Sequence, residues 1–191
     1  LNDMVKADCR DCRGCSVCCR DMGTSILLDP LDVHLLSEGL GQNFEALLNS
    51  GYMELHVVDG MILPNLKMDE NRNCCAFLNE QGRCSVHSFR PGDFRYFLQV
   101  HECPAGRSKI KVKKWIDTPE LQKNQQFIRE WHYFLKDIQE TFETEAGLAR
   151  QKAVNLYVLR EFYQTPFREG EFYRQFQERL ERARPACGLT L

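Results

Sequence analysis

The stretch Cys9-Arg-Asp-Cys12-Arg-Gly-Cys15-Ser-Val-Cys18-Cys19 repeats a two-residue gap between cysteines three times. Such a gap lets the backbone turn so that both flanking sulfurs face one small centre, as in zinc and iron–sulfur sites. Five cysteines so close together cannot all find disulfide partners of suitable geometry. The run therefore predicts that residues 1–25 form a loop around a thiolate-ligated metal site.

The same run can be read with the spacing of bacterial ferredoxins, in which the fourth cysteine serves a different cluster from the first three. Two features depart from that motif. Arg20 stands where the ferredoxin motif has proline, and no second copy of the run follows along the chain.

A second cysteine segment runs over residues 74–103. Cys75 and Cys84 flank a short turn, as ligands on a zinc or iron knuckle often do, so a closed site can draw sulfurs from both segments. Whether Cys9 and Cys74 are ligands is left open, and Cys187 is expected to be an ordinary buried thiol. The predicted metal ligands are Cys12, Cys15, Cys18, Cys19, Cys75, Cys84 and Cys103.

The histidines are expected to play lesser roles. His87 and His101 lie near predicted ligands, where hydrogen bonding to sulfur or surface exposure is favoured over coordination. His34, His56 and His132 have no cysteine neighbours in sequence and are expected to be structural.

Composition narrows the class of protein. Hydrophobic residues make up 43% of the 191 residues and charged residues 27%, with a net charge of −2, which is typical of a globular domain. A near-neutral balance favours neither nucleic acid nor an anionic membrane as partner, although residues 107–114 are locally basic. Ten cysteines without a recognisable export signal favour metal over disulfides and predict a cytoplasmic protein.

Local signals predict the elements that follow the first cysteine run. Asp29 and Pro30 predict the cap and first residue of a helix, and Asn43 predicts the cap of a shorter one. The first of these helices is expected to end at Gly39 and Gly41.

A hairpin and one more strand are predicted next. Asp59-Gly60 supplies the positive φ angles of a two-residue turn between strands over 54–58 and 61–66. Alternating residues over 109–116 favour a further strand.

The last third of the chain is predicted to be helical. Thr118-Pro119 begins a long helix, and residues 146–163 and 167–184 supply two more helical segments rich in Phe and Tyr. The expected fold is α+β and mostly helical, with cysteine-rich metal-binding loops and a small hairpin over residues 1–116. A C-terminal helical layer over residues 117–191 is expected to pack on it. Its aromatic stripe is expected to be core, and comprises Phe127, Trp131, Phe134, Leu135, Ile138 and Phe142.

The cysteine blocks together resemble the CxxCxxCC family, also called the YkgJ-type cysteine-cluster or zinc- or iron-chelating domain. Cys12-x2-Cys15-x2-Cys18-Cys19-Arg20 is similar to its opening signature, over a resemblance that spans roughly residues 9–106. The later blocks follow in order and are Cys75-Ala-Phe-Leu, Gly82-Arg83-Cys84-Ser-Val-His87, Arg90-Pro91 and Glu102-Cys103-Pro104. After Arg90-Pro91 the family continues to a further cysteine, which this chain lacks, so a loop is expected to be missing there.

The resemblance implies a metal or iron–sulfur site. It also implies a relative of known activity, because a similar cysteine domain occurs in flagellin lysine N-methylase. Adjacent Cys18-Cys19 and a surplus of thiolates favour an iron–sulfur cluster, with the four-iron form preferred, over a single zinc. Three functions remain open: metal handling or electron transfer, a methyltransferase of the flagellin-lysine type, and a structural zinc module that binds a protein partner through its aromatic helical layer. No catalytic residue is assigned, and the glycine-rich turn that commonly binds a nucleotide is absent.

Overall fold

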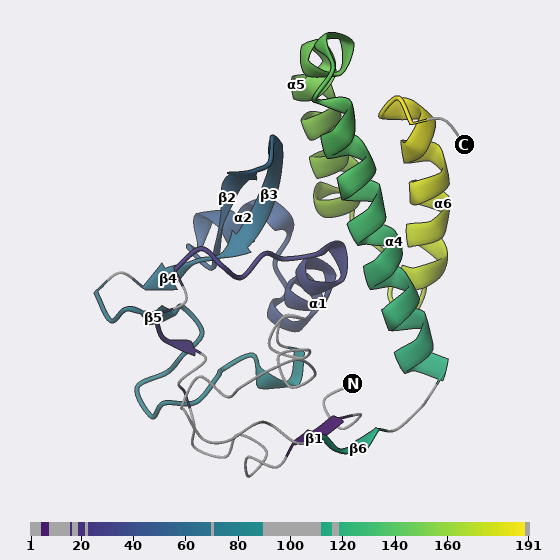
Figure 1. The fold of residues 1–191 in the computed structure, drawn as a ribbon. Helices are drawn as coiled ribbons and strands as arrows, with labels where there is room; N and C mark the ends of the chain where they lie inside the picture. The colour runs from purple at the N-terminus through teal and green to yellow at the C-terminus, as the bar shows by residue number, and fades with distance from the viewer. Residues whose placement is uncertain are drawn as a thin grey trace.

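The structure is a computed structural model that describes residues 5–7, 16, 19–21, 23–69, 71–89, 112–115 and 119–189. The fold is α+β and mostly helical, as predicted. Figure 1 shows α1, α2 and the β2–β3 hairpin in the middle, the second cysteine segment at the lower left, and three long helices at the right.

The first two helices begin where the sequence predicts. Asp29 caps α1 (Pro30–Leu40) through a capping box, because its side chain accepts from the Asp32 N–H while Asp32 accepts from the Asp29 N–H. The helix ends at Gly41, whose φ of 63° is left-handed. Asn43 caps α2 (Phe44–Asn49) by accepting from the N–H of Ala46 at 2.8 Å.

The predicted hairpin is confirmed. Strands β2 (Met53–Val58) and β3 (Met61–Leu66) pair antiparallel, with Val58 opposite Met61 across a two-residue turn. Asp59 and Gly60 have φ angles of 48° and 81°, as this kind of turn requires. The other edge of β3 is occupied, because its backbone bonds to residues 26–28.

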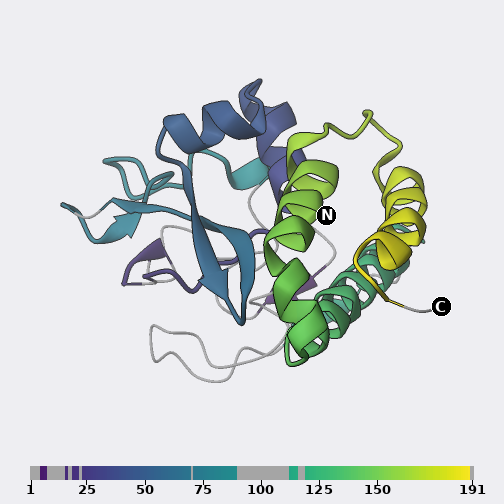
Figure 2. The ribbon, with the colours of Figure 1, turned by 90° about the horizontal axis from the view of Figure 1, so that it is seen from above.

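The C-terminal layer consists of α4 (Pro119–Thr141), α5 (Glu145–Leu159) and α6 (Phe172–Ala186). In Figure 2 the β2–β3 hairpin lies beside α5, and α4 and α6 lie together beyond it. The predicted segment 146–163 is confirmed as helical, but its last turn is a π-helix, η4 (Arg160–Gln164). The predicted start of the third helix at residue 167 is wrong, because α6 begins at Phe172.

A buried arginine explains the late start of α6. Arg179 on α6 is 7% exposed, and it donates hydrogen bonds to the carbonyls of Glu161, Thr165 and Pro166 at 2.5–2.8 Å. Its guanidinium also lies 3.8 Å from the centre of the Phe167 ring. These contacts hold the segment between η4 and α6 in a non-helical path.

The aromatic stripe is packed core, as predicted. Phe127, Trp131, Phe134 and Ile138 of α4 are buried and meet Phe162, Phe172 and Phe176 from the neighbouring segments. Leu135 and Phe142 are partly buried against the same core. Within the described part of this layer, the exposed large hydrophobic side chains are Tyr133, Leu148 and Leu156. The aromatic rings thus stabilise the interior, and the predicted protein partner would have to bind other side chains.

The helical layer shares its core with the hairpin and α1. The Asn155 Oδ1 of α5 accepts from the Ile62 N–H at 2.6 Å, and its Nδ2 donates to the Gly60 carbonyl at 2.9 Å. The Tyr163 hydroxyl donates to the Leu28 carbonyl at 3.1 Å. One hydrophobic cluster includes residues from both sides of the predicted division between residues 116 and 117. That division stays a prediction.

One short strand lies where a loop was predicted. Strand β1 (Val5–Ala7) pairs antiparallel with β6 (Val112–Trp115), which falls inside the strand predicted over 109–116. The expectation of an unbroken loop over residues 1–25 is therefore wrong at residues 5–7, because their partner strand is far away in sequence. No helix in the described ranges is long and apolar enough to cross a membrane.

Candidate metal centre

Three of the seven predicted ligands lie among the described residues: Cys19, Cys75 and Cys84. Cys19 and Cys84 are partly buried, and Cys75 is 4% exposed. The position after Arg90-Pro91, where a loop was expected, lies outside the described residues. So do six other residues with predicted or open roles: Cys9, Cys12, Cys15, Cys18, His101 and Cys103.

The two cysteine segments meet through their backbones. Arg20 and Cys74 form an antiparallel bridge, and the Asp21 N–H donates to the Asn73 carbonyl at 3.2 Å. The side chains of Asp21 and Asn73 are also hydrogen-bonded. The backbones of the two segments therefore meet at Arg20 and Cys74, the neighbours of Cys19 and Cys75.

Strand geometry separates the adjacent Cys74 and Cys75. They form β5 (Cys74–Cys75), which pairs with β4 (Met68–Asp69), so Cys75 lies opposite Met68. Successive side chains of a strand point to opposite faces. Cys74 and Cys75 therefore point to opposite faces of β5, and they are 1% and 4% exposed. At most one of the two can face a metal held on one side of this strand.

The Cys75 sulfur already accepts a hydrogen bond from the backbone. The Phe77 N–H points at the Cys75 Sγ, with 3.4 Å between nitrogen and sulfur. A donor of this kind stabilises the negative charge of a thiolate, and hydrogen bonds to sulfur tune thiolate-bound metals. The Phe77 side chain is buried and stacks on Tyr52 at 4.7 Å between ring centres, which fixes the donor in place.

The predicted turn between Cys75 and Cys84 is confirmed. Leu78 and Cys84 form an antiparallel bridge, and the Asn79 N–H donates to the Arg83 carbonyl at 2.9 Å. The Asn79 side chain accepts from the Arg83 N–H, and Gly82 has a left-handed φ of 69°. The turn brings the backbone of Cys84 beside Leu78, three residues after Cys75.

An arginine and an aspartate fix the entry to this segment, and sequence reasoning missed both. The Asp69 carboxylate accepts from the Arg72 Nε at 2.6 Å and from the Asn71 N–H, and Arg72 also donates to the Leu78 carbonyl. The Arg72 hydrogen bond holds the pKa of Asp69 below its ordinary value. The sequence signal that could have predicted this pair is an aspartate three residues before an arginine in a turn.

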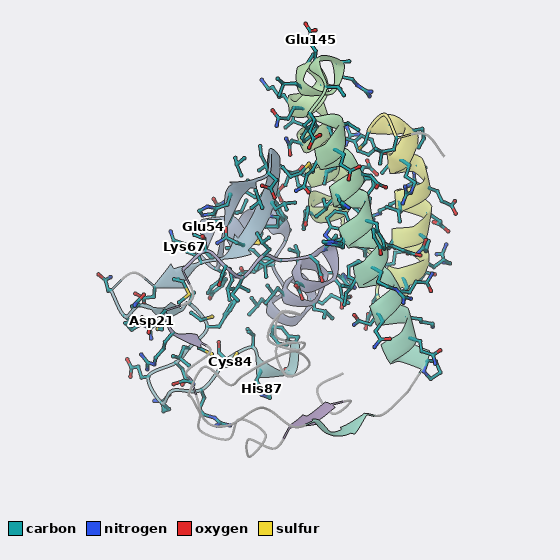
Figure 3. The ribbon with its side chains drawn as sticks, viewed as in Figure 1. Asp21, Glu54, Lys67, Cys84, His87 and Glu145 are labelled. Carbon is teal, nitrogen blue, oxygen red and sulfur yellow. The ribbon has the colours of Figure 1, made fainter. Side chains whose placement is uncertain are left out.

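Four of the five histidines lie among the described residues. His87 begins a short 3₁₀ segment (His87–Phe89) and is exposed, and Figure 3 shows it near Cys84 at the lower end of the molecule. His34 stacks on Phe172, and burial lowers its pKa. His56 lies 3.1 Å from Glu54 on β2, and His132 is exposed on α4.

Cys187 is a buried thiol at the end of α6. It is 2% exposed, and burial raises its pKa to about 11. A thiol with a raised pKa stays protonated at neutral pH, so it is a poor nucleophile and a poor metal ligand.

We expect Cys187 to react slowly with iodoacetamide in the folded protein near neutral pH, because little thiolate is present there and the sulfur is covered. Peptide mapping by mass spectrometry after timed alkylation measures this rate. The same thiol in urea-unfolded protein serves as the control. Equal rates in folded and unfolded protein would contradict the assignment.

Within the described ranges, no three His, Cys, Asp or Glu side chains form a group arranged to hold a metal ion. The described part of the predicted set is limited to Cys19, Cys75 and Cys84. Two observations nevertheless suit a thiolate-bound metal: the two cysteine segments meet through their backbones, and the soft Cys75 sulfur already accepts an N–H. The full ligand set stays a prediction.

Comparison with known proteins gives one match. The family model CxxCxxCC, described as "Putative zinc- or iron-chelating domain", matches residues 11–127. That range includes Cys19, Cys75, Cys84 and the first turns of α4. No curated protein and no solved structure matches the chain. Because the family model covers more than half of the sequence and includes the paired cysteine segments, this chain belongs to the CxxCxxCC family.

Proposed function

We propose that this protein holds a metal centre with cysteine thiolates from two segments, and that it acts in metal handling or electron transfer. The ligands in this proposal are Cys12, Cys15, Cys18, Cys19, Cys75, Cys84 and Cys103. The observation that carries it is the backbone pairing of Arg20 and Asp21 with Cys74 and Asn73, which joins the two cysteine segments. Structural metal sites commonly link stretches that are distant in sequence in this way.

An iron–sulfur cluster is the centre we favour over zinc. Adjacent Cys18-Cys19 and seven candidate thiolates exceed what one tetrahedral zinc requires. The Phe77 N–H aimed at Cys75 is the kind of hydrogen bond that shifts the reduction potential of a cluster. When bound, a cluster would supply one-electron chemistry, and zinc would supply only structure or a transferable ion. A reducing compartment such as the cytoplasm suits such a set of free thiols.

The residues of this chain would have three tasks in that function. Cys19 and Cys75 would hold the metal across the junction between the segments, and Cys84 would hold it from the following turn. The Phe77 N–H would offset the negative charge on the Cys75 sulfur. The Arg72–Asp69 pair would keep the second segment in its folded path.

The decisive experiment is metal analysis of protein purified without oxygen. We expect iron with stoichiometric sulfide and the broad visible absorption of a cluster, which would distinguish it from colourless zinc. Cys75→Ser and Cys84→Ser are each expected to weaken metal binding by about tenfold or more, since each removes a thiolate. Metal content by mass spectrometry measures the loss.

Cys187→Ser is the matched control, because it also removes one buried sulfur but from the far end of the helical layer. It should keep the metal content of the wild type. If Cys75→Ser and Cys84→Ser retained as much metal as Cys187→Ser, the second segment would not bind the centre and the proposal would fail.

A further inference from the structure

Strand β2 has an outer edge whose backbone groups make no hydrogen bond within the described part of the chain. Val58 and Met61 flank the two-residue turn, so Val58, His56 and Glu54 direct their N–H and C=O groups toward β3. The alternate residues Leu55 and Val57 direct theirs outward. The far edge of β3 is covered by α5 and by residues 26–28, so among the described residues β2 is the open edge of this sheet.

The side chains on this edge are unusually apolar for a surface strand. Leu55 is 41% exposed and Val57 is 71% exposed, and Val57 is the most exposed large hydrophobic side chain in the described residues. Proteins usually protect an open edge with lysine, proline or a bulge. Pro64 lies on the covered strand β3 and does not protect β2.

The polar side chains along β2 are self-complementary. Glu54 and His56 lie on the same face of the strand, 3.1 Å apart, with 36% and 39% of their side chains exposed. An antiparallel copy of the strand centred on Leu55 places Glu54 opposite His56 of the second copy, twice by symmetry. That pair occupies a non-hydrogen-bonded position, where facing side chains lie closest.

We propose that β2 is a dimerisation edge, on which a second copy of this chain adds its own β2 antiparallel to form a four-stranded sheet. Leu55 faces Leu55 of the second copy, and their outward N–H and C=O groups form the central pair of hydrogen bonds. The exposed faces of Leu55 and Val57 become covered, and the Glu54–His56 pairs fix the register. Figure 3 shows Glu54 on the side of the hairpin turned away from the helical layer.

Sedimentation velocity over a wide range of protein concentration tests the proposal. The wild-type protein should change from monomer to dimer, and Leu55→Lys and Val57→Lys should each weaken association by about tenfold or more. Leu148→Lys and Leu156→Lys are matched controls, because these leucines are 58% and 59% exposed but lie on α5. They should dimerise like the wild type.

A charge exchange tests the register. Glu54→Lys alone should weaken the dimer, because it places lysine opposite His56 of the second copy. Glu54→Lys combined with His56→Glu should restore it, because each lysine then faces a glutamate of the second copy. Hydrogen exchange should show the Leu55 and Val57 amides protected only at high concentration.

Three results would overturn the proposal. They are a wild type that stays monomeric at all concentrations, a dimer that Leu55→Lys and Val57→Lys leave intact, and a charge exchange that fails to restore association. Circular dichroism of each variant identifies any that has lost its fold, and the concentration dependence of the wild-type Leu55 amide decides the question without a variant.

Discussion

Stripping the metal from the purified protein is expected to remove amide protection around Cys75 and Cys84 and to leave most of it around Trp131. The second cysteine segment contains short elements: β5 has two residues and the turn to Cys84 is held by an isolated bridge. The entropy lost in ordering such a segment needs a large compensating term, and metal–sulfur bonds supply it.

The helices are expected to lose little amide protection in the same experiment. Trp131 packs against Phe134, Phe162, Tyr163 and Phe176, all of them buried, and none of these contacts involves sulfur. The hairpin should resemble the helices rather than the cysteine segment, because Asn155 bonds it to α5. The boundary between metal-dependent and metal-independent protection is therefore expected near the pairing of Arg20 with Cys74. It is not expected at the predicted division after residue 116.

Hydrogen exchange followed by peptide on loaded and chelator-treated protein measures this difference. Cys187→Ser should show the wild-type pattern in both states, since it lies outside the centre. If stripped protein kept full protection around Cys75 and Cys84, these sulfurs would be ordinary buried thiols. In that case Phe77, Leu78 and Val86, which are buried, would hold the segment by themselves.

Much of the fold could be predicted because its signals are local. The caps at Asp29 and Asn43 depend on side chains that bond within three residues, and the turn at Asp59-Gly60 depends on two backbone angles. The aromatic stripe of α4 repeats at helical spacing, so its burial follows from one face of one helix.

The errors in the predicted fold all involve distant partners. A helix was expected to begin at Phe167, directly after Thr165-Pro166. The Phe167 ring instead lies against Arg179, whose hydrogen bonds to nearby carbonyls cannot be inferred from sequence. Strand β1 was missed because its partner β6 lies about a hundred residues along the chain.

In the candidate site, too, the features that depend on neighbouring residues could be predicted and those that depend on distant residues could not. Cysteine spacing predicted the chemistry and the turn between Cys75 and Cys84, because both depend on neighbouring residues. The meeting of the two segments at Arg20 and Cys74 could not be predicted, because it joins residues that are far apart in sequence. The N–H of Phe77 carries no sequence signal at all, since every residue except proline has this donor.

Replacing Phe176 with alanine is expected to lower the free energy of unfolding by about 3–5 kcal/mol, the usual cost of truncating a buried phenylalanine. Phe176 is fully buried on α6 and joins three segments. Its ring lies 4.7 Å from that of Phe127, 5.8 Å from that of Phe162 and 6.2 Å from that of Trp131. Truncation leaves a cavity where α4, η4 and α6 meet, and the surrounding rings are too rigid to fill it.

Chemical denaturation of metal-loaded protein, followed by Trp fluorescence, measures the change. Tyr133→Ala is the matched control, because Tyr133 is an aromatic residue on α4 that is 57% exposed, and its loss should cost within about 0.5 kcal/mol. Phe176→Ala should bind metal like the wild type while it remains folded, since its contacts do not reach the cysteine segment. If Phe176→Ala lowered the free energy of unfolding as little as Tyr133→Ala, the stability of the helical layer would not depend on this core. Loss of metal from the folded variant would mean that the core and the metal centre are coupled more closely than their separate contacts imply.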